Sequence, residues 1–418
     1  MPSFAADATG WRASFTSLQY RDFRLLWLGQ FVSLGGSQMR VVAVNYQVYA
    51  LARASGQIDP ALALGLLGLA RVIPIVLTAM LSGVVADVVD RRKLLIFSTL
   101  IALGTSAVLA FGSSAEHVSI WLIYAMIAVA AVAGAFEMPA RQALIPVLVP
   151  AKHLPNALSL NVITWQLATV VGPSLAGVII AVAGVAPVYW IDTISFVAVI
   201  ISVLLMSKRV VPAATTTVSL AAAVEGLRFV FRTPMIASTM LIDFFATFFG
   251  AALTLLPLFA DQILHVGATE LGLLYAAPSA GAVVAAAVLT TRTIKRQGLV
   301  LLWSIVIFGL CTIVFGLSRW LPLTLLALAG TGAADTVSMV IRGTIRQLMT
   351  PNELRGRMVS VNMVFFAGGP QLGELEAGVL ASVIGAPLSV AIGGALCVAM
   401  VGWVAWHWRD LRSYTHAT

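Results

Sequence analysis

Long apolar runs separated by short polar segments make up the chain from residue 22 to residue 408. A helix needs about 20 residues to cross the hydrocarbon layer of a membrane, and each run reaches that length. The pattern therefore predicts twelve transmembrane helices. Their expected ranges are 22–50, 61–86, 94–113, 118–140, 157–183, 187–207, 235–262, 269–291, 298–317, 321–345, 357–383 and 386–408.

The longest polar connection lies near the middle of the chain and separates two sets of six predicted helices. It predicts an N-terminal six-helix half (1–206), a cytoplasmic connector (207–233) and a C-terminal six-helix half (234–418). The two halves resemble each other at a shift of 201 residues, which places Gly177 on Gly378. Repeats of this kind are typical of transporters, whose repeats face each other across a central cavity.

Composition and charge support a membrane protein. Hydrophobic residues make up 60% of the chain and charged residues 10%, whereas a soluble domain has about 25% charged residues. Nearly all 25 Lys and Arg residues fall in alternate connections, and the other connections hold only Arg53 and Arg319. Cytoplasmic loops are enriched in such bases, so we expect both termini in the cytoplasm. Topology explains the net charge of +8, and no nucleic-acid partner is expected.

Enzyme chemistry has little support in the sequence. It contains no phosphate-binding glycine loop followed by Lys and Ser or Thr, and no nucleophile elbow. The five His residues are scattered without metal-ligand spacing. We therefore expect no enzymatic activity, no cofactor and no metal site.

A charged motif, GVVADVVDRR (83–92), lies between the second and third predicted helices. Gly83, the acid Asp87 and the basic pair Arg91 and Arg92 resemble the signature of the major facilitator superfamily. Asp87 is expected at a helix end, where it can pair with a base or cap a neighbouring helix. The motif is then a gate latch; the alternative is an anchor that only fixes topology.

Further segments resemble one branch of this superfamily, which contains enterobactin-type siderophore exporters and macrolide efflux pumps. The segments are 23–51, 136–161, 189–196 and 350–362. The resemblance implies the major facilitator fold, alternating access, a monomer and a bacterial cytoplasmic membrane. Gly172, Pro173 and Gly177 in the fifth predicted helix also resemble the antiporter motif of drug/proton exchangers. Their alternative role is a packing kink, since small residues commonly serve helix contacts in membranes.

Several acids lie inside predicted helices, where charge is costly and marks a cavity or a partner. A carboxylate in a dehydrated cavity can load and release a proton near neutral pH. Asp243 is the first candidate for proton coupling and Asp335 the second, followed by Glu137 and Glu374. The alternative is a permanent ion pair with a base such as Arg40.

Four bases need a similar explanation. Arg40 and Arg71 lie deep inside the first and second predicted helices and could bind an anionic substrate or pair with a carboxylate. Arg141 and Arg342 occupy equivalent positions in the two halves. We expect them to bind loop carbonyls or acids at the cytoplasmic gate.

Aromatic and amide side chains suit an amphipathic substrate cavity, although packing or contact with lipid is the alternative for each. The candidates are Asn45, Tyr46, Tyr49, Trp165, Gln166, Phe245 and Phe249.

Together these features predict an all-α membrane protein with two pseudo-symmetric six-helix halves. The expected function is proton-coupled export of an amphipathic drug-like compound or a siderophore. The expected partners are the small amphipathic substrate, protons and the lipid bilayer. Two alternatives stay open: movement of lysophospholipids, and a non-transporting sensor or scaffold on the same fold.

Overall fold

The computed structural model describes residues 13–207, 228–291, 294–351 and 354–415. At residues 13–14, 79–84, 86–88, 355–357, 359–361 and 363–367 it describes the backbone alone. Most of the predicted connector, 207–233, therefore lies outside the described residues. Within these ranges the chain is helical, and no strand occurs among them.

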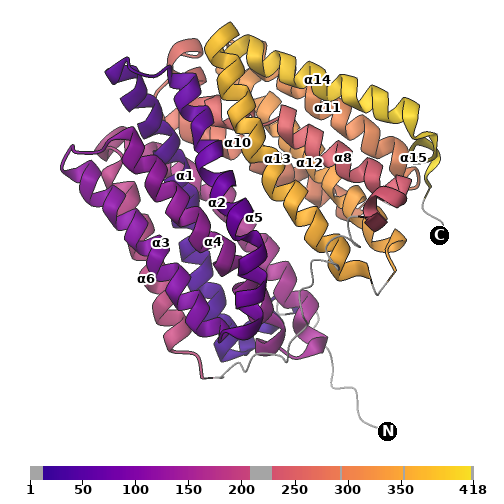
Figure 1. The fold of residues 1–418 in the computed structure, drawn as a ribbon, viewed down its shortest axis with the longest axis horizontal. Helices are drawn as coiled ribbons and strands as arrows, with labels where there is room; N and C mark the ends of the chain where they lie inside the picture. Colours follow the sequence, from indigo (N-terminus) through magenta and orange to yellow (C-terminus); the bar gives the residue numbers. More distant parts are fainter. Residues whose placement is uncertain (1–12, 208–227, 292–293, 352–353, 416–418) are drawn as a thin grey trace.

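Twelve long helices form the described part of the chain, in two sets of six (Figure 1). The first set is α1 (Arg21–Ser55), α2 (Pro60–Val88), α3 (Arg91–Ser114), α4 (Ile120–Leu148), α5 (Leu154–Ala183) and α6 (Ala186–Leu204). The second set is α8 (Pro234–Phe249), α10 (Ala268–Thr291), α11 (Gln297–Leu317), α12 (Leu321–Met349), α13 (Arg355–Ile384) and α14 (Ala386–His407). This architecture confirms the predicted all-α fold of twelve helices.

Ten helices in the described residues are long and apolar enough to cross a membrane. The other two long helices, α1 and α13, carry more charged residues. Charge is costly in lipid, so such helices should place their charges against protein. Accordingly, α1 packs on α5 and α6, and α13 packs on α2 and α8.

The seventh predicted helix, 235–262, is not continuous in the structure. After α8, the chain passes through η3 (Ala252–Leu255), α9 (Leu256–Leu258) and the π-helical η4 (Phe259–Ile263). Pro257 lies inside this segment, and proline cannot donate the backbone hydrogen bond that a continuous helix requires. The break allows the segment to change direction where the two halves meet.

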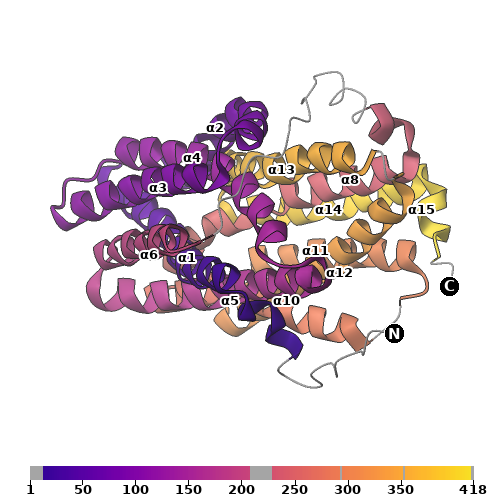
Figure 2. The same ribbon diagram turned by 90° about the horizontal axis from the view of Figure 1, so that it is seen from below.

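The halves meet along two seams, α2 against α13 and α5 against α10 (Figure 2). Each seam contains a glycine pair. A Cβ at Gly378 would lie 2.5 Å from the Cα of Gly65, and a Cβ at Gly177 would lie 2.8 Å from the Cα of Gly272. Because glycine has no side chain, the backbones of the two halves approach closely at both points.

Both seams lie toward the end of the bundle where α1 ends and α2 begins, which we call the far end. A buried apolar cluster joins the halves there, and it includes Leu64 of α2 and Phe259 of η4. The two largest of the other clusters lie within single halves, one in α1–α6 and one in α8–α15. The far-end cluster therefore joins the halves through close apolar packing, which is a main driving force for helix association in a membrane.

Short helices fix both described ends of the chain opposite the far end. In η1 (Ala13–Gln19), the buried Ser17 donates from its hydroxyl to Asn156 Oδ1, 2.6 Å away at the start of α5. In α15 (Arg409–Ser413), Leu411 is fully buried, and Tyr414 O accepts a 3.1 Å hydrogen bond from Gly298 N of α11. A Cβ on Gly298 would overlap the carbonyl oxygen of Leu411, so α15 lies directly on the start of α11.

Candidate functional site: a buried ion-pair cluster

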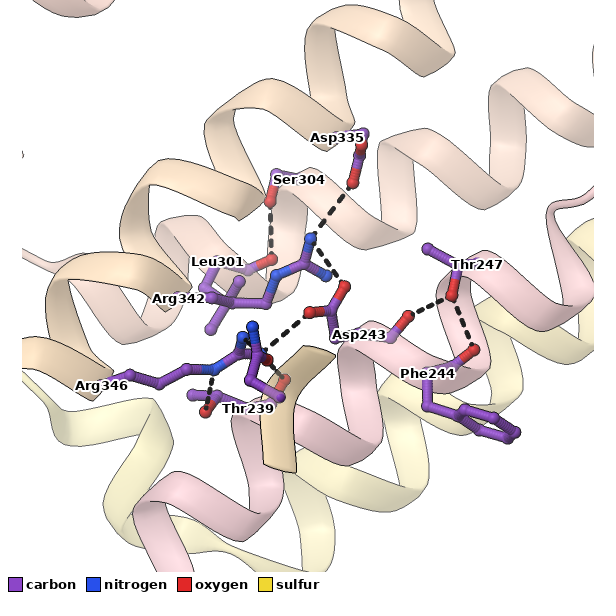
Figure 3. A network of polar contacts seen from close by, with 10 residues as sticks. Thr239, Asp243, Phe244, Thr247, Leu301, Ser304, Asp335, Arg342 and Arg346 are labelled. Atoms are coloured by element: carbon purple, nitrogen blue, oxygen red, sulfur yellow. Dashed lines mark hydrogen bonds and ion pairs between the residues drawn. The ribbon is translucent and has the colours of Figure 1, made fainter. Parts of the chain in front are cut away.

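One face of α12 carries three charged residues, Asp335, Arg342 and Arg346. They are spaced by seven and then four residues, and an α-helix has 3.6 residues per turn, so all three lie on the same face. Asp243, near the middle of α8, faces this stripe (Figure 3). The spacing on α12 and the packing of α8 together produce the cluster.

Asp243 binds both arginines, one with each carboxylate oxygen. Its Oδ1 lies 3.1 Å from Arg342 Nη2, and its Oδ2 lies 3.0 Å from Arg346 Nη2. All three residues are buried, with 7%, 3% and 6% of their surfaces exposed. A buried charge is tolerated when it is paired and hydrogen-bonded, so Asp243 stabilises both arginines in their buried positions.

Asp335 forms the less buried end of the cluster. Its Oδ1 lies 3.2 Å from the same Arg342 Nη2 that contacts Asp243, yet 45% of its side chain is exposed. Arg342 thus stands between an acid with a half-exposed side chain and an acid that is buried. Such an arrangement can transmit a change of charge at Asp335 to Asp243 through a shared cation.

Arg346 was not among the residues that the sequence singled out. It donates to Thr239 O on α8 (2.9 Å), and it also contacts Asn362 of α13. Arg346 lies near the end of an apolar run, where a base can also anchor a helix at the cytoplasmic face. Its position in the sequence alone therefore does not indicate a role in the cluster. One feature of the sequence could have indicated this role: Arg346 lies one helical turn after Arg342, on the face that carries Asp335.

Polar atoms beside the cluster have no protein partner. Among the described residues, these are Nε and Nη1 of Arg342 and the hydroxyl of Ser338. Buried polar groups without partners cost free energy unless water reaches them. These polar atoms beside the Asp243–Arg342 contact can therefore still form hydrogen bonds.

Arg40 and Arg71 pair with acids other than Asp243. Arg40 Nε lies 3.0 Å from Asp192 Oδ2, and Asp192 is fully buried. Arg71 Nη1 contacts both oxygens of Glu374, at 3.0 and 2.9 Å. The first pair lies within one half, whereas the second joins α2 to α13.

The predicted gating residues lie in separate places. Arg91 Nη1 donates to Ala143 O of α4 (3.3 Å), and Arg92 Nη2 donates to Val203 O of α6 (2.6 Å). Arg141 pairs with Glu137 one turn earlier on α4, at 3.3 Å. Its repeat equivalent Arg342 contacts acids within α8 and α12. At Gly83 and Asp87 the structure describes the backbone alone, so the contacts of the predicted latch lie outside what it describes.

Asp90 caps a helix, a role that the sequence motif alone did not predict. It is the N-cap of α3, and its Oδ1 accepts from the backbone N–H of Arg92 at 2.8 Å. A carboxylate at this position satisfies N–H groups that have no partner within the helix. Asp90 therefore fixes the start of α3, which sets the position of Arg91 and Arg92.

The residues of the predicted antiporter motif face two different helices. Gly177 and the carbonyl oxygen of Pro173 lie against Gly272 of α10, in the other half. Gly172 lies against Gly35 and Gln38 of α1, in its own half. The motif thus places α5 between α1 and α10.

The predicted aromatic and amide candidates do not form one group. Asn45 Nδ2 donates to the hydroxyl of Tyr275 across the halves, at 2.8 Å. Tyr46 and Tyr49 line a far-end pocket of about 560 Å³. On α8, Phe245 stacks on Phe249 with ring centroids 5.8 Å apart. On α5, Trp165 is 48% exposed and Gln166 is half-buried.

The far-end pocket is closed on one side by contacts between the halves. Asp261 of η4 contacts both Tyr49 and Arg53 of α1, and Gln262 Nε2 donates to the Tyr49 hydroxyl at 3.1 Å. These polar contacts reinforce the apolar cluster that joins the halves.

We expect Arg53→Gln to lower the free energy of unfolding by no more than about 1 kcal/mol, because exposed ion pairs contribute little. The side chains of Arg53 and Asp261 are 58% and 40% exposed. Thermal unfolding at low and high salt measures the effect, and salt should reduce it further. A loss as large as that of a buried pair would show that the Arg53 contact is shielded from water.

No group of three or more His, Cys, Asp or Glu side chains among the described residues could hold a metal ion.

Comparison with known proteins gives consistent results. A family model described as transmembrane secretion effector matches residues 12–417. The enterobactin exporter EntS of Citrobacter koseri is 27% identical over 379 residues, which cover 89% of this chain and 88% of that protein. The same exporter from Salmonella typhimurium is 26% identical over 379 residues, with the same coverage.

Solved structures show the same fold. A bacterial homologue of the human lysosomal transporter Spinster, in an inward-facing and unoccupied conformation, gives a TM-score of 0.72 at 15% identity. The match covers 95% of this chain and 99% of that one. An inward-facing bacterial homologue of the iron transporter ferroportin gives a TM-score of 0.69 at 15% identity, covering 94% and 99%.

Proposed function

The chain belongs to the transmembrane secretion effector family of the major facilitator superfamily, and from this premise we propose that it exports an amphipathic compound by proton-coupled alternating access. The compound is a siderophore or a drug-like molecule. Relatives named as enterobactin exporters, similar over most of the chain, support export. The bases gathered in alternate connections support an orientation with both termini in the cytoplasm, and in that orientation the far end faces outward.

The observation that carries the proton coupling is the position of Arg342 between Asp335 and Asp243. A proton that binds the exposed Asp335 cancels its charge and leaves Arg342 to Asp243 alone. Loss of the proton restores the competition between the two acids for Arg342. The protonation state of Asp335 thus changes the contact between α12 and α8.

The segment that follows α8 connects this contact to the far end. It runs through η3 and η4 to Asp261, which binds α1 of the other half. A shift of α8 against α12 therefore moves residues that hold the halves together. Packed interfaces that have two discrete arrangements can convert small local shifts into movements of domains.

Proteoliposome flux under an imposed pH gradient tests the proposal. The panel contains enterobactin and amphipathic drug-like compounds, and wild type is compared with Asp335→Asn and Asp243→Asn. We expect gradient-driven flux in the wild type and at least about a tenfold loss in each variant, which corresponds to about 1.4 kcal/mol.

The matched control is Glu116→Gln, which removes one negative charge from an exposed turn after α3. Its flux should equal that of the wild type. Unchanged gradient-driven flux in both aspartate variants would remove the cluster as the proton site. A sodium requirement without a response to pH would reject proton coupling.

A further inference from the structure

The two seams between the halves differ in charge. In the seam of α2 and α13, Arg71 contacts both carboxylate oxygens of Glu374. The shift of 201 residues that relates Gly378 to Gly177 also relates Glu374 to Pro173 in the other seam. There the carbonyl oxygen of Pro173 lies against Gly272, with no side-chain charge at the equivalent position. A close seam therefore forms without an ion pair, and the Arg71–Glu374 pair needs another explanation.

Backbone packing holds Glu374 beside Arg71. A Cβ on Gly68, one turn before Arg71, would overlap Gln371 O and lie 2.8 Å from the Cβ of Glu374. The two side chains are still partly accessible, at 19% and 18%. Glu374 thus occupies a position where water or a solute can reach the same guanidinium.

Two unpartnered acceptor atoms lie in the region of this pair. Gln371 Oε1 and Asn45 Oδ1 are buried and have no hydrogen-bond partner among the described residues. Gln371 precedes Glu374 by one turn, and Asn45 holds Tyr275, which is close enough to experience the charges of Arg71 and Glu374. The region therefore offers one cation and two vacant acceptors.

Alternating access, on which this inference rests, requires the seam to open. Opening separates Arg71 from Glu374, because the two residues belong to different halves. The Arg71 side chain is 19% exposed, and a charge that is largely buried is strongly unfavourable without its partner. The cation on Arg71 consequently needs a replacement anion when the seam opens.

We propose that Arg71 binds a carboxylate group of the transported compound and that Glu374 occupies this site until the compound displaces it. The planar carboxylate of Glu374, with both oxygens on one Nη1, shows the group that the site accepts. The compound is an amphipathic carboxylate with hydrogen-bond donors that reach Gln371 Oε1 and Asn45 Oδ1. The compound's own charge then allows the outer seam to open.

Equilibrium binding to the full-length protein in lipid nanodiscs tests this, with 4-phenylbutyrate and its neutral analogue 4-phenylbutyramide as probes. In the wild type, the carboxylate should bind at least about tenfold more tightly than the amide, the effect of one hydrogen bond to a charged group. Glu374→Gln removes the resident competitor, so carboxylate binding should tighten by about tenfold while amide binding stays unchanged. Arg71→Gln should abolish the discrimination.

Glu376→Gln is the matched control, because it removes the same charge from the same helix and no ion pair among the described residues involves Glu376. It should leave carboxylate binding unchanged. Equal tightening in the Glu374 and Glu376 variants, or equal binding of acid and amide by the wild type, would overturn the proposal. If Arg71→Gln does not fold, the tightening in Glu374→Gln decides alone.

This measurement needs neither flux nor a pH gradient. A protein that fails the proton-coupling test can still pass this one, and the reverse also holds.

Discussion

Replacing Asp243 with alanine is expected to lower the free energy of unfolding by about 3–5 kcal/mol, because it leaves a buried arginine without its carboxylate. Arg346 loses its only acid among the described residues, and Arg342 keeps only the partly exposed Asp335. Chemical or thermal unfolding of the purified protein in detergent measures the loss. The effect is large because both arginines are more than nine-tenths buried.

Asp335→Ala provides the comparison. It removes an acid from the same cluster, but one whose side chain is 45% exposed and which contacts a single arginine. It should lower stability much less than Asp243→Ala, since Asp243 still neutralises Arg342. Equal losses in the two variants would show that the cluster is hydrated throughout and that burial does not set its energy.

Replacing Gly177 with alanine is expected to reduce transport at least about tenfold by preventing closure of the seam between α5 and α10. The added Cβ would lie 2.5 Å from Ala268 O and 2.8 Å from the Cα of Gly272. Both are backbone atoms, so the helices must move apart. Spin labels on Val182 and Leu273, both exposed, should report a longer distance in the variant.

Gly104→Ala is the control for this change. Apart from the nearby backbone of its own helix, nothing lies within 4 Å of the position of its Cβ, so the same substitution meets open space. Transport and the labelled distance should both match the wild type. A normal distance in Gly177→Ala would mean that the seam tolerates the side chain and that the glycine contact does not limit closure.

The helices could be predicted from the sequence because each apolar run alone is long enough to span a membrane. The partners of the buried charges could not be predicted in this way. Arg71 and Glu374 are 303 positions apart, and their pairing depends on how α2 packs against α13. Single-helix periodicity contains no information about that packing.

The spacing of charged residues along α12 predicts part of the candidate site. It places Asp335 and Arg342 on one face of α12, and it could have added Arg346. It could not show that Asp243 would take both arginines, since that depends on the side of α8 that meets α12. Nor did it reveal the break after α8, because Gly250 and Pro257 are tolerated inside many membrane helices.

The seating of α15 on α11 bears on how the protein should be handled. Because Leu411 is fully buried and Tyr414 O accepts the hydrogen bond from Gly298 N, the last helix is part of the folded core. An affinity tag or fluorescent fusion should therefore follow Tyr414 through a flexible linker. Truncation at Trp408 would uncover the start of α11 and give a less stable preparation.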